Sequence, residues 1–276
     1  MNDYNNYNNS PYDNSQYGYG NGGQQPYGQQ GYGGQYTGMD QYRMGQQGRS
    51  YALEEATMKA YMTRVMSRVY LKMFIGLVVT ALSAGFLLSN ESILLTIFNN
   101  QILFWGLMIG ELAIVFVVSG MINKLSNTAA SALFYVYSAL NGITFAAVCL
   151  AFTGESIMLT FFVTAGVFLA MCIYGYTTKS DLSSLGTYLF MALIGVIIAS
   201  IANFFFQSST VEWIISFVGV GIFVGLTAWD TQKIKQMMME TSEENVGKVS
   251  TLGALSLYLD FVNLFLYLLR FLGRRN

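Results

Sequence analysis

The chain contains no histidine, two cysteines and two prolines, and only 11% of its 276 residues are charged. The lack of histidine excludes His-based zinc sites, Ser-His catalytic triads and the side chain that most often titrates near neutral pH. Soluble domains usually carry about 25% charged residues, so a water-soluble globular enzyme is not expected. The formal net charge of −1 offers no basic surface for nucleic acid.

Residues 1–50 lack large apolar side chains other than Tyr and Met. This segment has no Leu, Ile, Val, Ala, Phe or Trp, while Gly, Tyr, Gln and Asn fill 36 of its 50 positions. Such a composition has almost no aliphatic surface to bury and cannot offset the entropy lost on ordering the chain. We therefore predict a disordered tail over residues 1–50. Self-association of the tail through Tyr and Gln is the alternative.

Residues 51–276 hold every Leu, Ile, Val, Phe and Trp of the chain. A basic segment, 51–72, is predicted as a cytoplasmic lead-in helix, and a transmembrane domain over 73–276 follows it. Seven mostly apolar runs of about the length needed to span a bilayer can be marked out in that domain. They cover approximately 73–88, 102–122, 129–152, 157–176, 185–206, 211–229 and 252–272. No proline interrupts them and they are apolar all round, so we predict an all-α polytopic membrane protein.

The positions of Lys and Arg predict the orientation in the membrane. The lead-in and the loops after the second, fourth and sixth runs contain Lys or Arg, whereas the alternate loops, 89–101, 153–156 and 207–210, contain none. By the positive-inside rule, we expect the N-terminus to lie in the cytoplasm. Seven crossings would then place Arg270, Arg274 and Arg275 outside. Either the last run crosses despite them, which we favour, or it is re-entrant.

Three carboxylates lie at or near membrane depth, where ionisable groups are costly and are candidates for function. They are Glu111, Asp230 and Asp260. A short connection makes the sixth and seventh helices antiparallel neighbours, so Asp230 and Asp260 can meet. Two carboxyl groups in contact would share a proton and would respond to pH without histidine. When ionised, their oxygens would suit calcium as transient ligands.

Less specific roles remain open for several of these residues. Asp230 could be an interfacial carboxylate screened by Lys233, and Glu111 could bond a Ser or Thr hydroxyl and support packing. Asn263 and Asn203 could add amide oxygens to the aspartate pair, although Asn in membrane helices more often bonds between helices. The two cysteines, Cys149 and Cys172, are expected to be free thiols inside helices. No cofactor is expected.

Several motifs carry a resemblance to a known family. The segments LSLYLDFVNLFLYLLRFLG and AWDTQKIK resemble the signature of the Bax inhibitor-1 family, whose bacterial members are YccA-like. The segments YGYTTKSDLSSLG, NGITFAAV and MALIGVIIASIANFFF are similar to the middle region of that family. The resemblance covers about residues 55–273. It implies a seven-helix fold whose last helix is enclosed by the other six, and a bacterial inner-membrane protein.

The resemblance also implies a function and its residues. It implies a pH-sensitive calcium leak and protection from stress or cell death, while some bacterial relatives restrain a membrane protease. The paired aspartates of the family match Asp230 and Asp260, and its second-helix acid matches Glu111. Relatives carry a basic cluster after the second helix that latches onto the helix-six aspartate. Here the corresponding stretch, MINKLSN, has Lys124 as its only cation.

We therefore expect a calcium-permeable leak channel gated by Asp230 and Asp260, with Glu111, Asn263 and Lys124 in supporting positions. The alternative is a regulator that binds another membrane protein, such as a protease, in the lipid bilayer. An enzyme is not expected. Intramembrane aspartyl proteases carry a GxGD context around one aspartate, whereas the contexts here are AWDT and YLDF.

Overall fold

The computed structural model describes residues 38–276, so most of the predicted disordered tail lies outside the described residues. Within that range the chain forms helices and no strand, apart from one isolated bridge between Phe152 and Arg275. The helices are α1 (Gly38–Leu88), α2 (Glu91–Asn99), α3 (Gln101–Gly120), η1 (Ile122–Lys124), α4 (Asn127–Ala151), α5 (Gly154–Thr177), α6 (Ser183–Phe206), α7 (Ser209–Glu240), η2 (Glu243–Asn245) and α8 (Val246–Leu272).

Seven of these helices are long and apolar enough to cross a membrane, which confirms the predicted fold class. They are α1, from Tyr51 onward, and α3 to α8. Inside a bilayer an α-helix is favoured because it satisfies the backbone hydrogen bonds of the segment internally. The short connections carry polar residues that cap the next helix. Ser126, for example, accepts a hydrogen bond from the Ala129 amide at the start of α4.

Several helix boundaries differ from those predicted. The first helix begins at Gly38 and continues without interruption through the basic segment 51–72 into the first span. The short helix α2 occupies part of the connection 89–101, where Leu94 packs on Leu87 and Ala146. The sixth span does not end at Trp229, because α7 continues to Glu240. Burial of polar Gln232 together with apolar side chains explains this extension, which hydropathy does not reveal.

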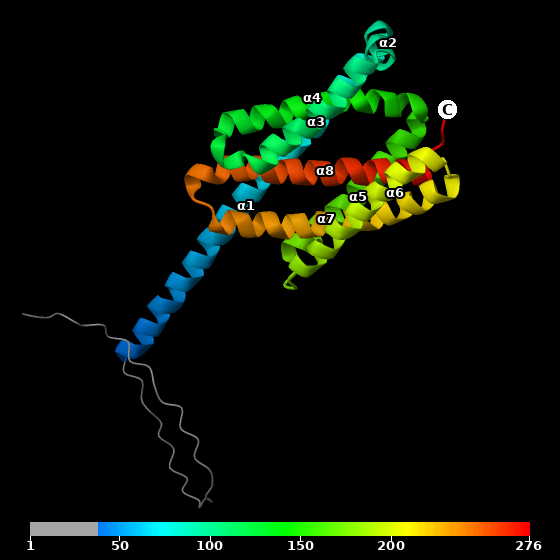
Figure 1. Ribbon diagram of the computed structural model, residues 1–276. Helices are drawn as coiled ribbons and strands as arrows, with labels where there is room; N and C mark the ends of the chain where they lie inside the picture. Colours follow the sequence, from blue (N-terminus) through cyan, green and yellow to red (C-terminus); the bar gives the residue numbers. More distant parts are fainter. Residues whose placement is uncertain (1–37) are drawn as a thin grey trace, which may run out of the picture. The chain divides into compact units, whose positions relative to one another are not determined.

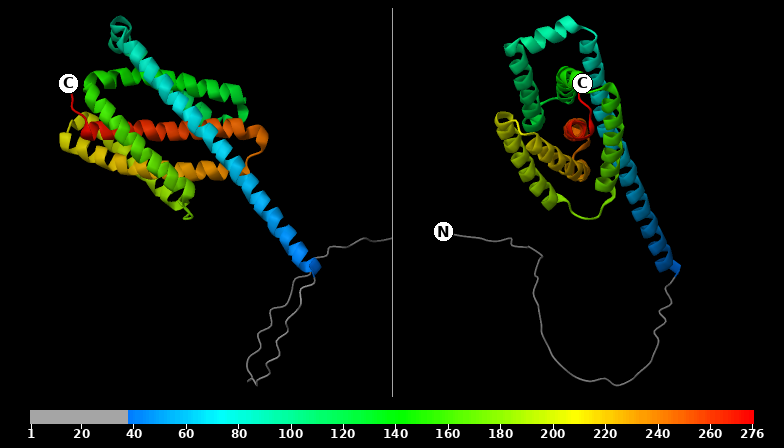
Figure 2. Two further views of the ribbon diagram at one scale, coloured as in Figure 1. Left: turned by 180° about the vertical axis from the view of Figure 1, so that it is seen from behind. Right: turned by 90° about the vertical axis from the view of Figure 1, so that its right-hand side faces the viewer.

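Helix α8 lies at the centre of the bundle. Figure 2 (right) shows it end-on with the other spanning helices around it, and 67% of its apolar window is buried, a larger share than in any other span of the described chain. Its fully buried side chains include Leu257, Tyr258 and Leu264. The expectation that the last helix is enclosed by the other six is therefore confirmed. Helices α7 and α8 lie side by side, joined by η2 (Figure 1).

The last helix crosses the full bundle and is not re-entrant. Beyond its end, the Arg274 carbonyl accepts a hydrogen bond from the Thr153 amide, and the Asn276 amide donates to the Ala151 carbonyl. The C-terminal residues therefore lie at the end of the bundle where α4 is connected to α5. This is an end whose loops lack Lys and Arg, so the three arginines stand apart from the positive-inside pattern.

Two glycines allow the backbone of a neighbouring helix to approach closely. A Cβ atom at Gly142 of α4 would collide with the Thr80 carbonyl of α1, and one at Gly175 of α5 would collide with the Ala228 carbonyl of α7. Small residues let helix backbones approach closely in membranes, where apolar burial against lipid contributes little to association. Gly175 thus brings α5 against the turn of α7 that precedes Asp230.

Candidate functional site

Asp230 and Asp260 meet across the contact between α7 and α8. Their carboxyl groups lie close enough to share a hydrogen bond. Asp260 is only 4% exposed, whereas Asp230 is half-buried. Helix α7 continues beyond Trp229, which draws Asp230 into the bundle and places it opposite the middle of α8. The sequence prediction that these two residues are neighbours agrees with this geometry.

The Asp260 carboxylate is incompletely bonded. Its Oδ2 atom is buried and accepts no hydrogen bond from any described residue. A buried polar atom without a partner destabilises the folded state, and a carboxylate more than most. Adjacent carboxylates also repel each other when both are ionised, so a shared proton or a bound cation would stabilise the pair.

Three neutral polar side chains accompany the aspartate pair. Tyr70 of α1, Cys172 of α5 and Thr231 of α7 lie beside one another, and Cys172 is close enough to Asp260 to sense its charge. Tyr70 and Cys172 also line a groove of about 330 Å³ between α1 and α5. Cys172 therefore lies both at the groove and within electrostatic range of Asp260.

Lys233 is the cation that acts on Asp230. It follows Asp230 by about one helical turn on α7, and its ammonium lies 4.6 Å from the centre of the Trp229 ring. Its side chain is exposed, so the attraction is weakened by solvent. Lys233 thus lies within electrostatic range of Asp230, which also meets Asp260.

Glu111 does not join the aspartate pair. Its Oε1 atom accepts a 2.7 Å hydrogen bond from the Thr144 hydroxyl of α4, and Asn141 lies within hydrogen-bonding range. Asn141 in turn accepts a hydrogen bond from Tyr258 of α8 at 3.1 Å, and the Tyr258 hydroxyl lies 2.6 Å from that of Thr80 in α1. We call these five residues the hydroxyl network. It links four helices on the side of α8 that faces α4.

The other predicted supporting residues lie elsewhere. Asn263 donates to the Leu259 carbonyl one turn back in its own helix. Asn203 accepts a hydrogen bond from the Ser208 amide and so closes the turn after α6. Lys124 lies exposed in η1. None of these contacts reaches Asp230 or Asp260. The two cysteines are free thiols, with Cys172 buried and Cys149 half-buried.

Comparison with known proteins identifies the family. Residues 62–276 match the family model described as "Inhibitor of apoptosis-promoting Bax1". The chain is 47% identical over 221 residues to "Inner membrane protein YbhL" of Escherichia coli K12, which covers 79% of this chain and 94% of the relative. The chain belongs to the Bax inhibitor-1 family. An uncharacterized protein of Borreliella burgdorferi is 45% identical over 215 residues, with 77% and 93% covered. Protein RP147 of Rickettsia prowazekii is 42% identical over 216 residues, with 77% and 90% covered.

This Bax inhibitor-1 family member has a polar contact that the sequence did not indicate. The half-buried ammonium of Lys72 in α1 donates to the Thr251 hydroxyl at 2.6 Å, the Ser131 hydroxyl at 2.9 Å and the Gly247 carbonyl at 3.2 Å. These contacts join α1, α4 and α8 near the start of α8. In the sequence, Lys72 is one cation among several in the lead-in, and no pattern there indicates its partners.

Proposed function

We propose that this family member provides a calcium-permeable leak path across the bacterial inner membrane, and that Asp230 and Asp260 form its pH-responsive gate. One observation carries the proposal. The buried Oδ2 atom of Asp260 accepts no hydrogen bond from an N–H or hydroxyl group of the described chain, and its neighbour is a second carboxyl group, that of Asp230. A pair held only for stability would be expected to have its oxygens bonded, as buried polar groups generally are.

The two protonation states of the pair have different consequences. When both carboxylates are ionised, they repel each other and attract a hard cation, for which oxygen ligands are preferred. When they share a proton, the repulsion is removed and α7 and α8 can pack closely. Calcium takes six to eight oxygens. The pair would supply only some of them, which suits an ion in passage.

The orientation is part of the same proposal. The predicted cytoplasmic N-terminus puts the junction of α7 and α8, with Lys233, Lys235 and Lys248, on the cytoplasmic side. The aspartate pair then lies at the depth of the middle of α8, and the C-terminal residues lie on the opposite side of the membrane from this junction. Glu111 supports the packing around α8 through the hydroxyl network, whereas supporting roles of Asn263 and Lys124 remain part of the proposal.

Calcium flux into proteoliposomes across a pH series tests this function. The full chain, Asp230→Asn and Asp260→Asn are reconstituted at equal density, with calcium-dependent dye fluorescence as the readout. We expect a pH-dependent flux from the full chain and loss of the pH dependence in both variants. Asp181→Asn is the matched control, because Asp181 is an exposed carboxylate in the α5–α6 loop. Equal leak from all four proteins at every pH would overturn the gate.

A second candidate function is regulation of another membrane protein. Residues 51–60 continue α1 beyond the buried part of the bundle, and every side chain in this stretch is exposed, including Leu53 at 67% and Met58 at 53%. Such a helix suits binding to a partner helix, as in a stress or cell-death modulator that restrains a membrane protease. A chain that co-purifies with a membrane protease but conducts no calcium would favour this function.

A further inference from the structure

A polar hollow of about 510 Å³ lies at the C-terminal end of the bundle. It is formed where α6 and α8 end and α7 begins, so its depth corresponds to the boundary between the hydrocarbon and the headgroups. Its lining is mostly polar and includes Asn203, Gln207, Glu212, Arg270 and Arg275. The hollow is remote from the aspartate pair, which lies toward the other end of α7.

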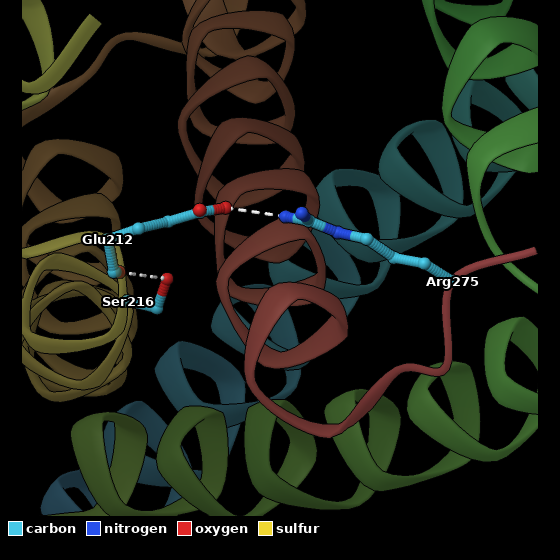
Figure 3. Close-up of polar contacts among 3 residues, drawn as sticks. All are labelled: Glu212, Ser216 and Arg275. Carbon is cyan, nitrogen blue, oxygen red and sulfur yellow. Dashed lines mark hydrogen bonds and ion pairs between the residues drawn. The ribbon is translucent and has the colours of Figure 1, made fainter. Parts of the chain in front are cut away.

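Two arginines but only one carboxylate line the hollow. Arg275 Nη2 lies 2.6 Å from Glu212 Oε1, across the gap between the C-terminal residues and α7 (Figure 3). In the same view the Ser216 hydroxyl donates to the Glu212 backbone carbonyl, one turn along α7. Both partners of the ion pair remain partly exposed, with side-chain exposures of 64% and 39%. The remaining N–H groups of Arg275 are therefore accessible to a ligand.

Arg270 supplies the excess positive charge. Its guanidinium lies 5.9 Å from the centre of the Tyr267 ring, and no carboxylate of the described chain pairs with it. Asn203 uses its oxygen to accept from the Ser208 amide, which leaves its amide N–H groups as donors beside the arginines. The hollow thus presents mainly donors and positive charge, which is the chemistry that binds phosphate.

Exposed aromatic side chains lie close in sequence to residues that line the hollow, and one of them, Phe204, lines it. Phe204, Phe205 and Phe206 are 77%, 76% and 81% exposed at the end of α6. On the neighbouring side, Trp213 stacks on Phe217 with ring centres 5.8 Å apart, and Phe271 packs against both. Trp is enriched at the membrane interface, and exposed Phe rings at this depth would contact acyl chains. A ligand at this place therefore has both an anionic head and apolar chains.

We propose that the hollow binds the phosphate headgroup of an anionic phospholipid, with Arg270 and Arg275 holding the phosphate and the aromatic side chains contacting the acyl chains. Glu212 competes with the phosphate for Arg275. Two substitutions should therefore change lipid affinity in opposite directions: loss of the Glu212 charge strengthens lipid binding, whereas loss of the Arg270 charge weakens it. The site also explains how arginines are retained at an end of the bundle whose loops have no other Lys or Arg.

Native mass spectrometry of the full chain in detergent, titrated with phosphatidylglycerol or phosphatidylcholine, tests the proposal. We expect preferential binding of phosphatidylglycerol, weakened about fivefold by Arg270→Gln, as loss of one interfacial cation predicts. Arg274→Gln is the matched control: it removes the same charge from the adjacent C-terminal segment, but Arg274 does not line the hollow. Glu212→Gln is expected to bind phosphatidylglycerol more tightly than the full chain.

Three results would overturn the lipid site. In the first, Arg274→Gln weakens binding as much as Arg270→Gln, which indicates diffuse surface charge. In the second, phosphatidylcholine binds as well as phosphatidylglycerol. In the third, millimolar inorganic phosphate displaces phosphatidylglycerol, which indicates a site for a free anion. If Arg270→Gln does not fold, Glu212→Gln decides the question, because unchanged or weaker lipid binding by that variant contradicts the competition.

Discussion

Tyr258 and Asp260 are close neighbours on α8, yet the two sides of the helix on which they lie are bonded very differently. Tyr258 belongs to the hydroxyl network, in which it contacts Asn141 and Thr80 at hydrogen-bonding distance. Asp260 faces Asp230 with a buried oxygen that has no donor in the described chain. A fully bonded buried network rigidifies a fold, whereas an incompletely bonded one marks a place where a proton or an ion can act.

Helix backbones approach closely on both sides, and the two sides differ in hydrogen bonding. Gly142 brings α1 and α4 together beside the hydroxyl network, and Gly175 brings α5 and α7 together beside the aspartates. The contrast teaches that the bundle can hold α8 firmly through one side. In the proposed gate, a change of protonation on the other side would leave this hydrogen-bonded contact in place.

The largest effect is expected from Gly142→Ala. The added methyl group would collide with the Thr80 carbonyl and the Ser83 side chain, so α1 must move away from α4 and from Tyr258. We expect the free energy of unfolding in detergent to fall by about 1–3 kcal/mol, as for overpacking of other buried sites. Gly166→Ala is the control, because a Cβ there meets nothing within 4 Å. If both variants lose the same free energy of unfolding, the close approach of α1 and α4 at Gly142 does not contribute to stability more than an exposed helical glycine does.

A direct test compares Tyr258→Phe with Asp260→Asn. The first variant removes the hydroxyl shared with Asn141 and Thr80, and we expect it to lower the free energy of unfolding by about 0.5–1.5 kcal/mol. The second variant replaces a carboxylate by an amide of the same shape, which can donate to Asp230. It should therefore leave stability unchanged or raise it. A comparable loss of stability in Asp260→Asn would mean that the aspartate pair is a structural contact like the hydroxyl network.

Hydropathy predicted the seven spans because a bilayer requires long apolar helices. The short connection between α7 and α8 predicted that Asp230 and Asp260 are neighbours, because it limits where α8 can lie. The C-terminal end of α7 could not be predicted, because a tertiary contact determines it. The Gln232 side chain accepts from the Leu182 amide and donates to the Ser180 carbonyl, so a polar residue is buried by a loop distant in sequence.

The partners of Thr80, Tyr258 and Lys72 could not be predicted at all. Hydroxyl groups are common in the chain, and nothing in their spacing specifies which of them meet across helices. The partner of Arg275 could not be predicted for the same reason. The sequence showed only that Arg275 departs from the positive-inside rule, whereas its contact with Glu212 depends on how the start of α7 and the end of α8 come together.

The smallest effect is expected at Asp181, a fully exposed carboxylate that serves as the reference for the buried pair. Its Oδ1 accepts a 2.9 Å hydrogen bond from the Ser183 amide at the start of α6, and bonding to Ser183 lowers the pKa of Asp181 below its usual value of 3.8. A carboxyl group with a lowered pKa stabilises the fold above its unfolded-state pKa, and this contribution is lost as pH falls through the folded-state pKa.

Asp181→Ala should therefore lower the unfolding midpoint slightly between pH 5 and 7, by an amount that shrinks to nothing in more acidic buffers. Thermal unfolding in detergent across this series measures the difference. If the difference in unfolding midpoint between the full chain and Asp181→Ala increases in acid, Asp181 behaves like a buried carboxylate. It could then no longer serve as the exposed reference for Asp260.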